Sequence, residues 1–322
     1  MLEKLDRRIL TQIQSSFPVV SEPYKEIATR LHIDGKQIIA DIKRLKKDKI
    51  IRRIGAIFDS RQLGYSSTLI AAKTDPAKEA QVAEFVNKFN EVTHNYGRED
   101  DYNLWFTLIA ESEEKIAMIL SKISALKAVQ DIRNLPAKNL FKVRVEFDFE
   151  ASSSCTVDSN IKDVAQFELL DKDTKLIRLL QENLPLTQKP FCTIAKKLGL
   201  SEAQVLKRVN DWLDVGVIRR LGAVVNHHQA GISANGMVVW QVPASKVKKT
   251  GETMACFKEV THCYERPTFP GWKYNLYTMV HGKNRKACQE IANQISKKVH
   301  IKDYKVIFSN KQYKKTSMKY FA

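Results

Sequence analysis

The sequence predicts an α+β protein made of two tandem copies of one unit, a winged helix-turn-helix followed by a ferredoxin-like βαββαβ domain. The main observation is an internal repeat: IRRIGA at 51–56 returns as IRRLGA at 218–223, and VTHNYGR at 92–98 returns as VTHCYER at 260–266. In each copy, helical spacing of apolar residues comes first, and alternating strand and helix patterns follow. With 322 residues, 43% of them hydrophobic, the chain can form a core in both copies.

Helices open each copy. Apolar residues recur at helical spacing in three segments per copy: 5–15, 24–31, 36–47, 173–182, 191–198 and 201–215. The last of these begins at Ser201, a favoured helix N-cap. A short strand follows each trio, at 50–58 and at 217–225, and we interpret it as the wing of a helix-turn-helix unit.

Strands and helices alternate after each wing. The first copy has predicted strands at 67–73, 92–98, 102–111 and 129–149, with helices at 78–89 and 112–126. The second copy has predicted strands at 236–241, 260–265, 273–281 and 301–308, with helices at 246–257 and 285–298. Both series read βαββαβ, which is the order of a ferredoxin-like antiparallel sheet with two helices on one face.

These elements define five segments. We expect winged helix-turn-helix units at 1–62 and 169–229, ferredoxin-like domains at 63–149 and 230–322, and a linker at 150–168. The linker prediction rests on a run of serines and short polar residues. The C-terminal segment KQYKKTSMKYFA is basic, and we expect it to be mobile.

Composition narrows the class of protein. The formal charge of +17 indicates an anionic partner, either nucleic acid or a small molecule with many carboxylates. No apolar run reaches the roughly 18 residues of a membrane span, and the charged N-terminus does not resemble a signal peptide, so we expect a cytoplasmic protein without a membrane partner. The 5 cysteines include no CxxC pair, so neither a disulfide framework nor a zinc site is expected.

The repeated polar strand is the strongest sign of chemistry. Side chains alternate along a strand, so His94, Tyr96 and Arg98 share one face. The second copy repeats the row with His262 and its neighbours Tyr264 and Arg266. A single histidine on a strand is more often structural, but its return inside a matching polar strand favours a functional role. The two sites are not equivalent: the second connection from arginine to asparagine is four residues longer, Cys263 replaces Asn95, and Tyr277 replaces Trp105.

A winged helix joined to a ferredoxin-like domain resembles the Lrp/AsnC family of feast/famine regulators over nearly the whole chain, once per copy. Two segments, RRIGAIFDSRQLGYSSTLIA at 52–71 and VTHNYGREDDYNLWFTL at 92–108, look like the siroheme decarboxylases, which share the regulator fold but act on a modified tetrapyrrole. In that group two related proteins usually form a heterodimer. The resemblance implies that both halves are fused here into an internal pseudo-heterodimer, with or without further homo-oligomers.

The resemblance implies the loss of CO2 from two acetate side chains of siroheme, at C12 and C18, giving 12,18-didecarboxysiroheme. It implies no cofactor and no metal beyond the iron that the substrate carries. The catalytic candidates are then His94, Tyr96, His262 and Tyr264. Histidine can deliver a proton near neutral pH, and tyrosine can orient a carboxylate or pass the proton on.

Arginine suits the carboxylates of the substrate because its guanidinium offers paired donors in one plane. The substrate-binding candidates are Arg98, Arg266, Arg52, Arg53, Arg219, Arg220, Trp105, Asn103 and Asn275. Aromatic residues near the rows, among them Tyr102, Trp272 and Tyr274, could stack on the macrocycle. Two alternatives stay open: the arginines of the wings could instead hold the helix-turn-helix backbone or contact phosphates, and Trp105 could belong to the core.

Two rival functions remain. A DNA-binding regulator of the Lrp type would use the lysines and Arg44 of 36–47 near phosphates, and this first helix stays open as a DNA reader. The equivalent helix of the second copy carries Glu202, Asp211 and Asp214 and suits DNA poorly, so we do not expect DNA to be the partner. A heme sensor would bind the tetrapyrrole without turnover. His227 and His228, just after the second wing, have no counterpart in the first copy, and an iron-ligating role for them is unsupported.

Overall fold

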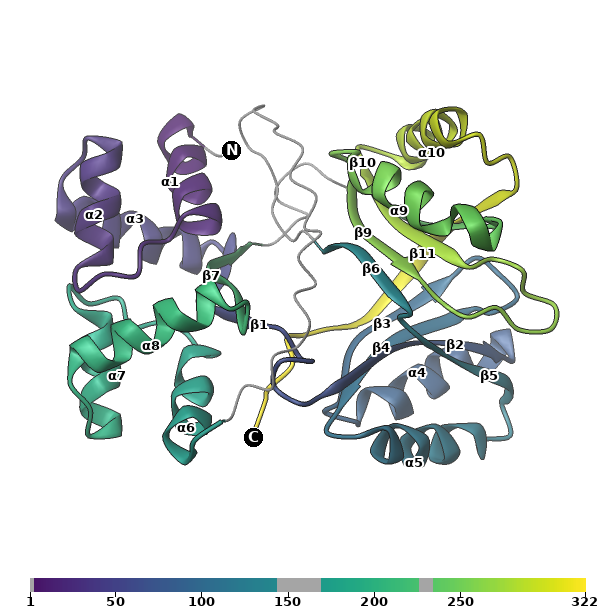
Figure 1. The fold of residues 1–322 in the computed structure, drawn as a ribbon, viewed down its shortest axis with the longest axis horizontal. Helices are drawn as coiled ribbons and strands as arrows, with labels where there is room; N and C mark the ends of the chain where they lie inside the picture. The colour runs from purple at the N-terminus through teal and green to yellow at the C-terminus, as the bar shows by residue number, and fades with distance from the viewer. Residues whose placement is uncertain (1–2, 144–168, 226–233) are drawn as a thin grey trace.

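The computed structural model describes residues 3–143, 169–225 and 234–322. The molecule has two parts (Figure 1): the helices of both helix-turn-helix units lie together on one side, and a β layer with its own helices lies on the other. The wing strands β1 (Ile51–Phe58) and β7 (Ile218–Val225) lie between the two parts. The predicted α+β class and the duplicated unit are confirmed.

The helix-turn-helix units share one core. Their helices are α1 (Lys4–Ser15), α2 (Pro23–Leu31), α3 (Gly35–Lys47), α6 (Asp171–Leu180), α7 (Pro190–Leu198) and α8 (Glu202–Asp214). Local signals set their ends: the Asp34 side chain accepts from the Lys36 backbone at α3, Ser201 and Gln204 form a capping box at α8, and Gly199 ends α7 in the left-handed region. The apolar faces from both copies pack into one cluster, so neither unit is complete alone.

The wings of the two copies pair with each other. Strands β1 and β7 run antiparallel, with Gly55 opposite Gly222. A Cβ at Gly222 would lie 2.5 Å from the Ile13 carbonyl oxygen, and one at Gly55 would lie 2.4 Å from the Glu182 carbonyl oxygen. Both glycines are therefore needed because the C-terminal end of a helix from the opposite copy presses against each wing.

One arginine of each wing also binds the helix end that packs against that wing. Arg53 donates to the Gln181 carbonyl oxygen at the end of α6, and Arg220 donates to the Gln14 carbonyl oxygen in the last turn of α1. Carbonyl groups in the last turn of a helix lack partners within the helix, and a cation there also suits the helix dipole. The repeated motif of two arginines followed two residues later by glycine thus fastens the two copies together.

The β layer contains both ferredoxin-like domains. Its strands are β2 (Ser66–Thr74), β3 (Val92–Arg98), β4 (Leu104–Ala110), β5 (Val129–Pro136), β6 (Asn139–Val143), β8 (Ala234–Trp240), β9 (Val260–Glu265), β10 (Leu276–Gly282) and β11 (Tyr304–Lys315). Its helices are α4 (Glu79–Asn87), α5 (Glu113–Ser124), α9 (Val247–Ala255) and α10 (Arg285–Val299), with 3-10 turns at Pro76–Lys78 and Ala244–Lys246. The predicted βαββαβ order is confirmed in both copies, with β6 following the first series after a break.

The two copies exchange strands. The order in the sheet is β5-β2-β4-β3-β11-β8-β10-β9-β6. Strand β11 pairs with β8 over Tyr304–Phe308 and then with β3 of the first copy over Ser309–Lys315. In the same way β5 pairs with β2, while β6, just after it in the chain, pairs with β9 of the second copy. The strands β3 and β9 are therefore each held between one strand of their own copy and one from the other copy.

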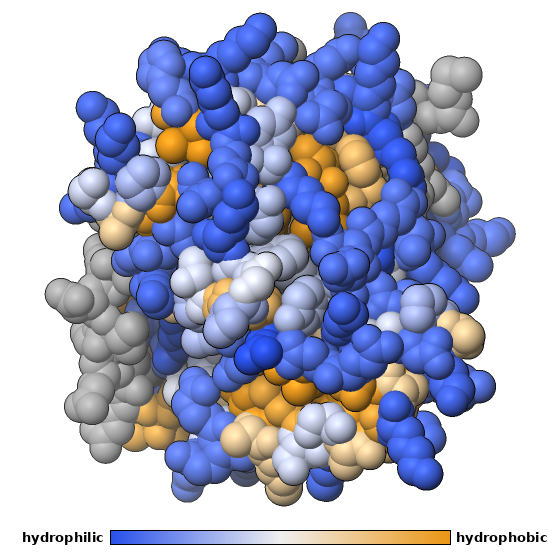
Figure 2. Space-filling model, turned by 90° about the vertical axis from the view of Figure 1, so that its right-hand side faces the viewer, coloured by the Kyte–Doolittle hydropathy of each residue, from blue (hydrophilic) through white to orange (hydrophobic). Residues whose placement is uncertain are grey.

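Helices cover one face of each half of the sheet. Apolar clusters lie between β2, β3, β4 and α4 and α5 in the first copy, and between β8, β9, β10 and α9 and α10 in the second. The opposite faces meet in a third core that is rich in aromatic residues, including Trp105, Trp272 and Tyr277. On the side of the β layer remote from the helix-turn-helix units, most of the surface is hydrophilic, with apolar groups visible in patches (Figure 2).

The expectation of a mobile C-terminal segment is wrong. Residues 311–315 belong to β11, and Thr316 then donates to the Thr93 carbonyl oxygen at 2.8 Å. Tyr320 is buried in the shared helix-turn-helix core, where its backbone exchanges two hydrogen bonds with the Gln181 side chain. The lysines of the segment suggested a solvated tail. Instead, its first residues pair with β3, and Tyr320 and Phe321 pack in the shared helix-turn-helix core.

Some predicted features fall outside the described residues. The linker at 150–168, the end of the strand predicted at 129–149, and His227 and His228 are among them, and the predicted domain boundaries stay predictions. In the part that is described, the strand material of 129–149 divides at Pro136 into β5 and β6. No helix of the described ranges is both long and apolar enough to cross a membrane.

The wing contact predicts the effect of a small substitution. Gly222→Ala places a Cβ against the Ile13 carbonyl oxygen, so we expect a loss of about 1–3 kcal/mol in the free energy of unfolding. Gly35→Ala is the control, because a Cβ there meets nothing within 4 Å and alanine favours a helix. Urea unfolding of both variants measures the difference. Equal stabilities would show that the wings are not tightly packed against the helix ends.

Candidate active site

The polar row of the first copy lies on β3 as the alternation predicted. The rings of His94 and Tyr96 stack with their centroids 6.3 Å apart, and the Arg98 guanidinium carbon lies 5.7 Å from the centre of the Tyr96 ring. Asn95 points to the other face, where its amide donates to the Ala83 carbonyl oxygen of α4 at 3.2 Å. The helix side of the strand is thus used for packing, and the row faces away from the helices.

The second copy reproduces the row on β9. The rings of His262 and Tyr264 stack at 6.2 Å, and the Arg266 guanidinium carbon lies 4.7 Å from the centre of the Tyr264 ring. Cys263 takes the helix side, where its sulfur lies 3.6 Å from the Gly251 carbonyl oxygen of α9. The strand exchange places β11 beside the first row and β6 beside the second.

Each row ends in a buried guanidinium that reaches the opposite copy. Arg98 donates to the Ile307 carbonyl oxygen on β11 at 3.0 Å, and Arg266 donates to the Leu135 carbonyl oxygen on β5 at 2.5 Å. Among the described residues, neither Nε has a hydrogen-bond acceptor. Burial lowers the pKa of Arg98 to about 10, so it remains charged at neutral pH. These cations fasten the copies together and keep donor capacity for an anion.

The adjacent arginines of each wing point in different directions. Arg53 and Arg220 hold helix ends, as described above, which gives them a structural role. Arg52 instead donates to the Lys315 carbonyl oxygen at 3.0 Å, and Lys315 pairs with His94 in the β ladder. Arg219 lies near the second row, where its charge lowers the pKa of His262. Arg52 and Arg219 are therefore the wing arginines that the fold brings to the rows.

A buried carboxylate orders the cations beside the second row. The Asp59 carboxylate accepts from Arg219 at 2.9 Å and from Arg61 at 2.9 Å. Burial acts to raise the pKa of Asp59, but the hydrogen bonds from Arg61 and the charge of Arg219 outweigh it, so its pKa is lowered. One negative charge thus holds two guanidiniums, which leaves a net positive charge near Tyr264.

Both row histidines are neutral at neutral pH. Burial, followed by the charges of Lys315 and Arg52, lowers the pKa of His94 to about 4. Burial also lowers the pKa of His262 to about 3, with further contributions from His281, His94, Arg219 and Arg266. A proton on His94 would disfavour a proton on His262, so the two rows lie within electrostatic range of each other. They form one polar region with two histidines.

His281 is a site residue that the sequence reasoning missed. The Thr261 hydroxyl oxygen lies 2.9 Å from Nδ1 of His262 and 2.9 Å from Nε2 of His281. In the first copy Thr93 makes the equivalent contact with His94 at 3.1 Å. An alignment of the two copies could have drawn attention to His281, because an imidazole there replaces an apolar residue near the end of a strand.

Three other candidates are held by the protein itself. Trp105 is buried in the third core against Trp272, and its indole donates to the Tyr102 carbonyl oxygen. The Asn103 amide binds the backbone N–H and carbonyl of Thr74 at 2.9 and 3.3 Å. The Asn275 amide binds the same two groups of Val242 at 2.9 and 2.8 Å. Each asparagine thus binds the backbone near the end of a neighbouring strand, which explains why the residue is repeated. The substrate-binding role of the two asparagines stays a prediction.

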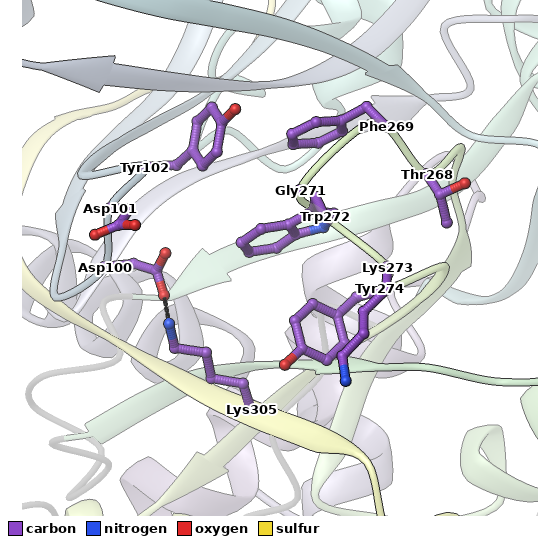
Figure 3. Close-up of a pocket in the computed structure, with 10 residues that line it drawn as sticks. All are labelled: Asp100, Asp101, Tyr102, Thr268, Phe269, Gly271, Trp272, Lys273, Tyr274 and Lys305. Atoms are coloured by element: carbon purple, nitrogen blue, oxygen red, sulfur yellow. Dashed lines mark ion pairs between the residues drawn. The ribbon is translucent and has the colours of Figure 1, made fainter.

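A cavity of about 670 Å³ lies away from the histidines, between the β3–β4 loop and the longer connection of the second copy. Figure 3 shows Tyr102, Phe269, Trp272 and Tyr274 around it, with Asp100 paired to Lys305 at its rim. Three of the aromatic residues expected to stack on the macrocycle, Tyr102, Trp272 and Tyr274, thus line this cavity, whereas Trp105 lies opposite Tyr96 in the sheet. The cavity contains none of the predicted catalytic residues.

Comparison with known proteins covers both parts of the unit. A model described as the AsnC-like ligand binding domain matches residues 62–142 and 229–314. A model described as the siroheme decarboxylase NirDL-like HTH domain matches residues 6–52 and 173–219. Each model therefore matches once per copy.

One relative matches the chain over nearly its whole length, and a subunit-sized relative matches about half of it. A siroheme decarboxylase of Hydrogenobacter thermophilus is 36% identical over 317 residues, which is 98% of this chain and 94% of the relative. A siroheme decarboxylase beta subunit of Methanosarcina barkeri is 44% identical over 151 residues, which is 47% of this chain and 99% of the subunit. The crystal structure of the siroheme decarboxylase NirDL superposes with a TM-score of 0.75 at 34% identity, covering 99% of this chain and 95% of that one.

The fold and the matches define the class: a fused pair of AsnC-like units, each a helix-turn-helix followed by a ligand-binding domain. More specifically, the chain belongs to the siroheme decarboxylase family, whose members are carboxy-lyases.

The lowered pKa values of three histidines predict how stability depends on pH. His94, His262 and His281 have pKa values lowered from 6.5 to about 4, 3 and 4. Below pH 6.5 the unfolded chain therefore binds protons that the folded chain does not, and the free energy of unfolding falls as the pH drops toward 4. Histidine NMR titration and denaturation at several pH values measure this. Titration of these rings near 6.5 would contradict it.

Proposed function

We propose that the protein removes CO2 from two acetate side chains of siroheme, at C12 and C18, to give 12,18-didecarboxysiroheme in heme biosynthesis. The observation that carries the proposal is the repeated His–Tyr–Arg row beside cations that outnumber their counter-charges, in a chain that aligns over 98% of its length with a siroheme decarboxylase. A structure of NirDL in co-complex with an iron-uroporphyrin III analogue, 32% identical with a TM-score of 0.74, shows that a protein of this architecture holds an iron tetrapyrrole.

Cations at the rows suit the carboxylates of this substrate. Arg52 and Lys315 lie beside the first histidine, and Arg219 and Arg61 lie beside the second tyrosine. Asp59 holds Arg219 and Arg61 in place, so little side-chain entropy is lost when an anion binds to them. Arg98 and Arg266 supply buried charge at the far end of each row. The net charge of +17 favours the approach of a polyanion.

The rows can also provide the chemistry. Loss of CO2 from an acetate leaves an electron pair on the carbon beside the ring, and a proton must replace the carboxylate there. A histidine within the rows is the proton donor, and the half-buried setting limits competing reactions with water. Burial raises the pKa of Tyr96 and of Tyr264, so both phenols keep the proton with which they can bind a carboxylate oxygen.

The proposal includes no cofactor beyond the iron that the substrate brings, and a cytoplasmic location. DNA is not proposed as a partner. Glu202 at the start of α8 accepts a hydrogen bond from Ser21 of the first copy at 3.0 Å, and Asp211 pairs with Lys207 on the same helix. A helix that would read DNA bases is here engaged with the other copy and carries acidic groups.

Siroheme turnover tests the function directly. Under anaerobic conditions, we expect the purified protein to convert siroheme to a product lighter by two CO2 units, as measured by mass spectrometry. His94→Ala and His262→Ala should each lower the rate, by about 10²–10⁴-fold for whichever histidine donates the proton. Unchanged siroheme with a shifted absorption spectrum would indicate a sensor, and full activity of the double variant would exclude histidine from the mechanism.

The wing arginines provide a matched pair for substrate binding. Arg219→Gln should weaken siroheme binding about tenfold, because it removes a charged donor beside the second row. Arg220→Gln should leave the dissociation constant unchanged and lower stability, because Arg220 holds the end of α1. Titration of both variants by absorption, together with thermal unfolding, separates the two roles. Equal affinities would count against a carboxylate role for Arg219.

A further inference from the structure

The Thr261 hydroxyl group lies between two imidazole rings, those of His262 and His281. Its hydroxyl oxygen is 2.9 Å from Nδ1 of His262 and 2.9 Å from Nε2 of His281. A hydroxyl group has one proton, so it can donate to only one of these nitrogens and must accept from the other. The positions of the protons on the two rings are therefore coupled through Thr261.

The coupling leaves two arrangements for neutral rings. In one, His281 donates from Nε2 to the Thr261 oxygen, Thr261 donates to Nδ1 of His262, and His262 carries its proton on Nε2. In the other, His262 donates from Nδ1 and its Nε2 is bare. The first arrangement is the one that can give a proton to a substrate, and a shift of protons along the chain converts it into the second.

The first copy has only part of this chain. Thr93 contacts His94, but the position that corresponds to His281 is Ile109. The correspondence is structural as well: the backbone N–H of Ile109 donates to the Glu91 carbonyl at 2.9 Å, and that of His281 donates to the Glu259 carbonyl at 3.1 Å. An alkyl side chain cannot pass a proton, so the two halves differ in proton transfer.

We propose that Thr261 and His281 form a proton relay that allows a neutral His262 to donate its Nε2 proton to the substrate carbon from which CO2 departs. The inference rests on the proposed function and makes it more specific, because it assigns proton delivery to the second half of the chain. His281 acts through Thr261 and does not touch the substrate, so it is a positioning and relay residue.

The protons and electrons balance in the proposed step. The bond between the acetate carbon and its carboxylate carbon breaks, CO2 leaves, and the electron pair that remains takes the proton from Nε2 of His262. At the same time Thr261 gives its proton to Nδ1 of His262 and receives the Nε2 proton of His281. His281 takes up one proton from solution at Nδ1, which is the proton that the overall reaction consumes. When the product leaves, a proton enters at Nε2 of His262, the chain shifts back, and His281 releases one.

The low basicity of these rings favours a relay over a charged donor. A histidine with a pKa of about 3, as for His262, is protonated in only about one molecule in 10⁴ at pH 7. The groups that disfavour its cation face it from several elements: His281 on β10, His94 on β3, Arg219 on β7 and Arg266 after β9. His281 is neutral for similar reasons, through burial and Lys315. A neutral ring can release one proton without becoming an anion only if it takes up another.

The experiment compares variants of the full-length protein in single turnovers with siroheme. His281→Gln keeps an N–H donor for Thr261 but cannot pass a proton, so we expect the decarboxylation rate to fall about 10²-fold while the siroheme dissociation constant stays unchanged. Thr261→Val should have a similar effect, and Thr261→Ser should restore most of the rate. Ile109→Gln is the matched control at the corresponding position of the first copy and should keep the wild-type rate.

The solvent isotope effect distinguishes a relay from a structural role. In mixtures of light and heavy water, the wild-type rate should show a curved dependence on deuterium content, because several protons move in the same step. The rate of His281→Gln should depend on deuterium content linearly. A wild-type rate for His281→Gln, or the same curvature in both, would overturn the relay.

Failure of the wild-type protein to release CO2 would instead refute the proposed function. ¹⁵N NMR of His262 then still tests the relay, because loss of Thr261 should change its tautomer, and an unchanged tautomer would overturn the coupling.

Discussion

The exchange of strands between the two copies is the constraint on which the rest of the structure depends. A strand with histidine, tyrosine and arginine on one face has little apolar surface to bury, and its backbone groups need partners on both sides to stay in a sheet. Strand β3 obtains its second partner from β11, and β9 obtains its second partner from β6. The polar rows are therefore central strands, held rigidly enough to position rings and guanidiniums.

This rigidity brings like charges together. Arg52 and Lys315 act on one histidine, Arg219 and Arg266 act on the other, and Asp59 is the carboxylate that binds two of the nearby guanidiniums. Burial of cations with few counter-charges is unfavourable for the empty protein, since neither water nor carboxylates fully compensate them. A ligand with many carboxylates relieves this repulsion. The same positive field keeps the histidines neutral, so binding and proton transfer have one electrostatic origin.

Much of the architecture was predictable because the repeat is strong and each element has its own period. The paired rows were also predictable, since alternation along a strand fixes which side chains share a face. The exchange of strands was not, because a strand pattern does not indicate which partner it will join. Arg52 and Arg53 point in opposite directions because successive side chains alternate along a strand. Which of the two reaches the row depends on tertiary packing. His281 was missed because its role arises only when β9 and β10 bring it to Thr261.

The path of β11 has a consequence for how the protein is made. The first copy leaves the ribosome long before residues 309–315, so β3 has a free edge until synthesis of the chain is nearly finished. Tyr320 completes the core of the opposite layer still later. The two copies are therefore separate in sequence but not in folding. Fusion into one polypeptide guarantees that every first half acquires the matching second half, in equal number, at the moment when its exposed edge most needs to be covered.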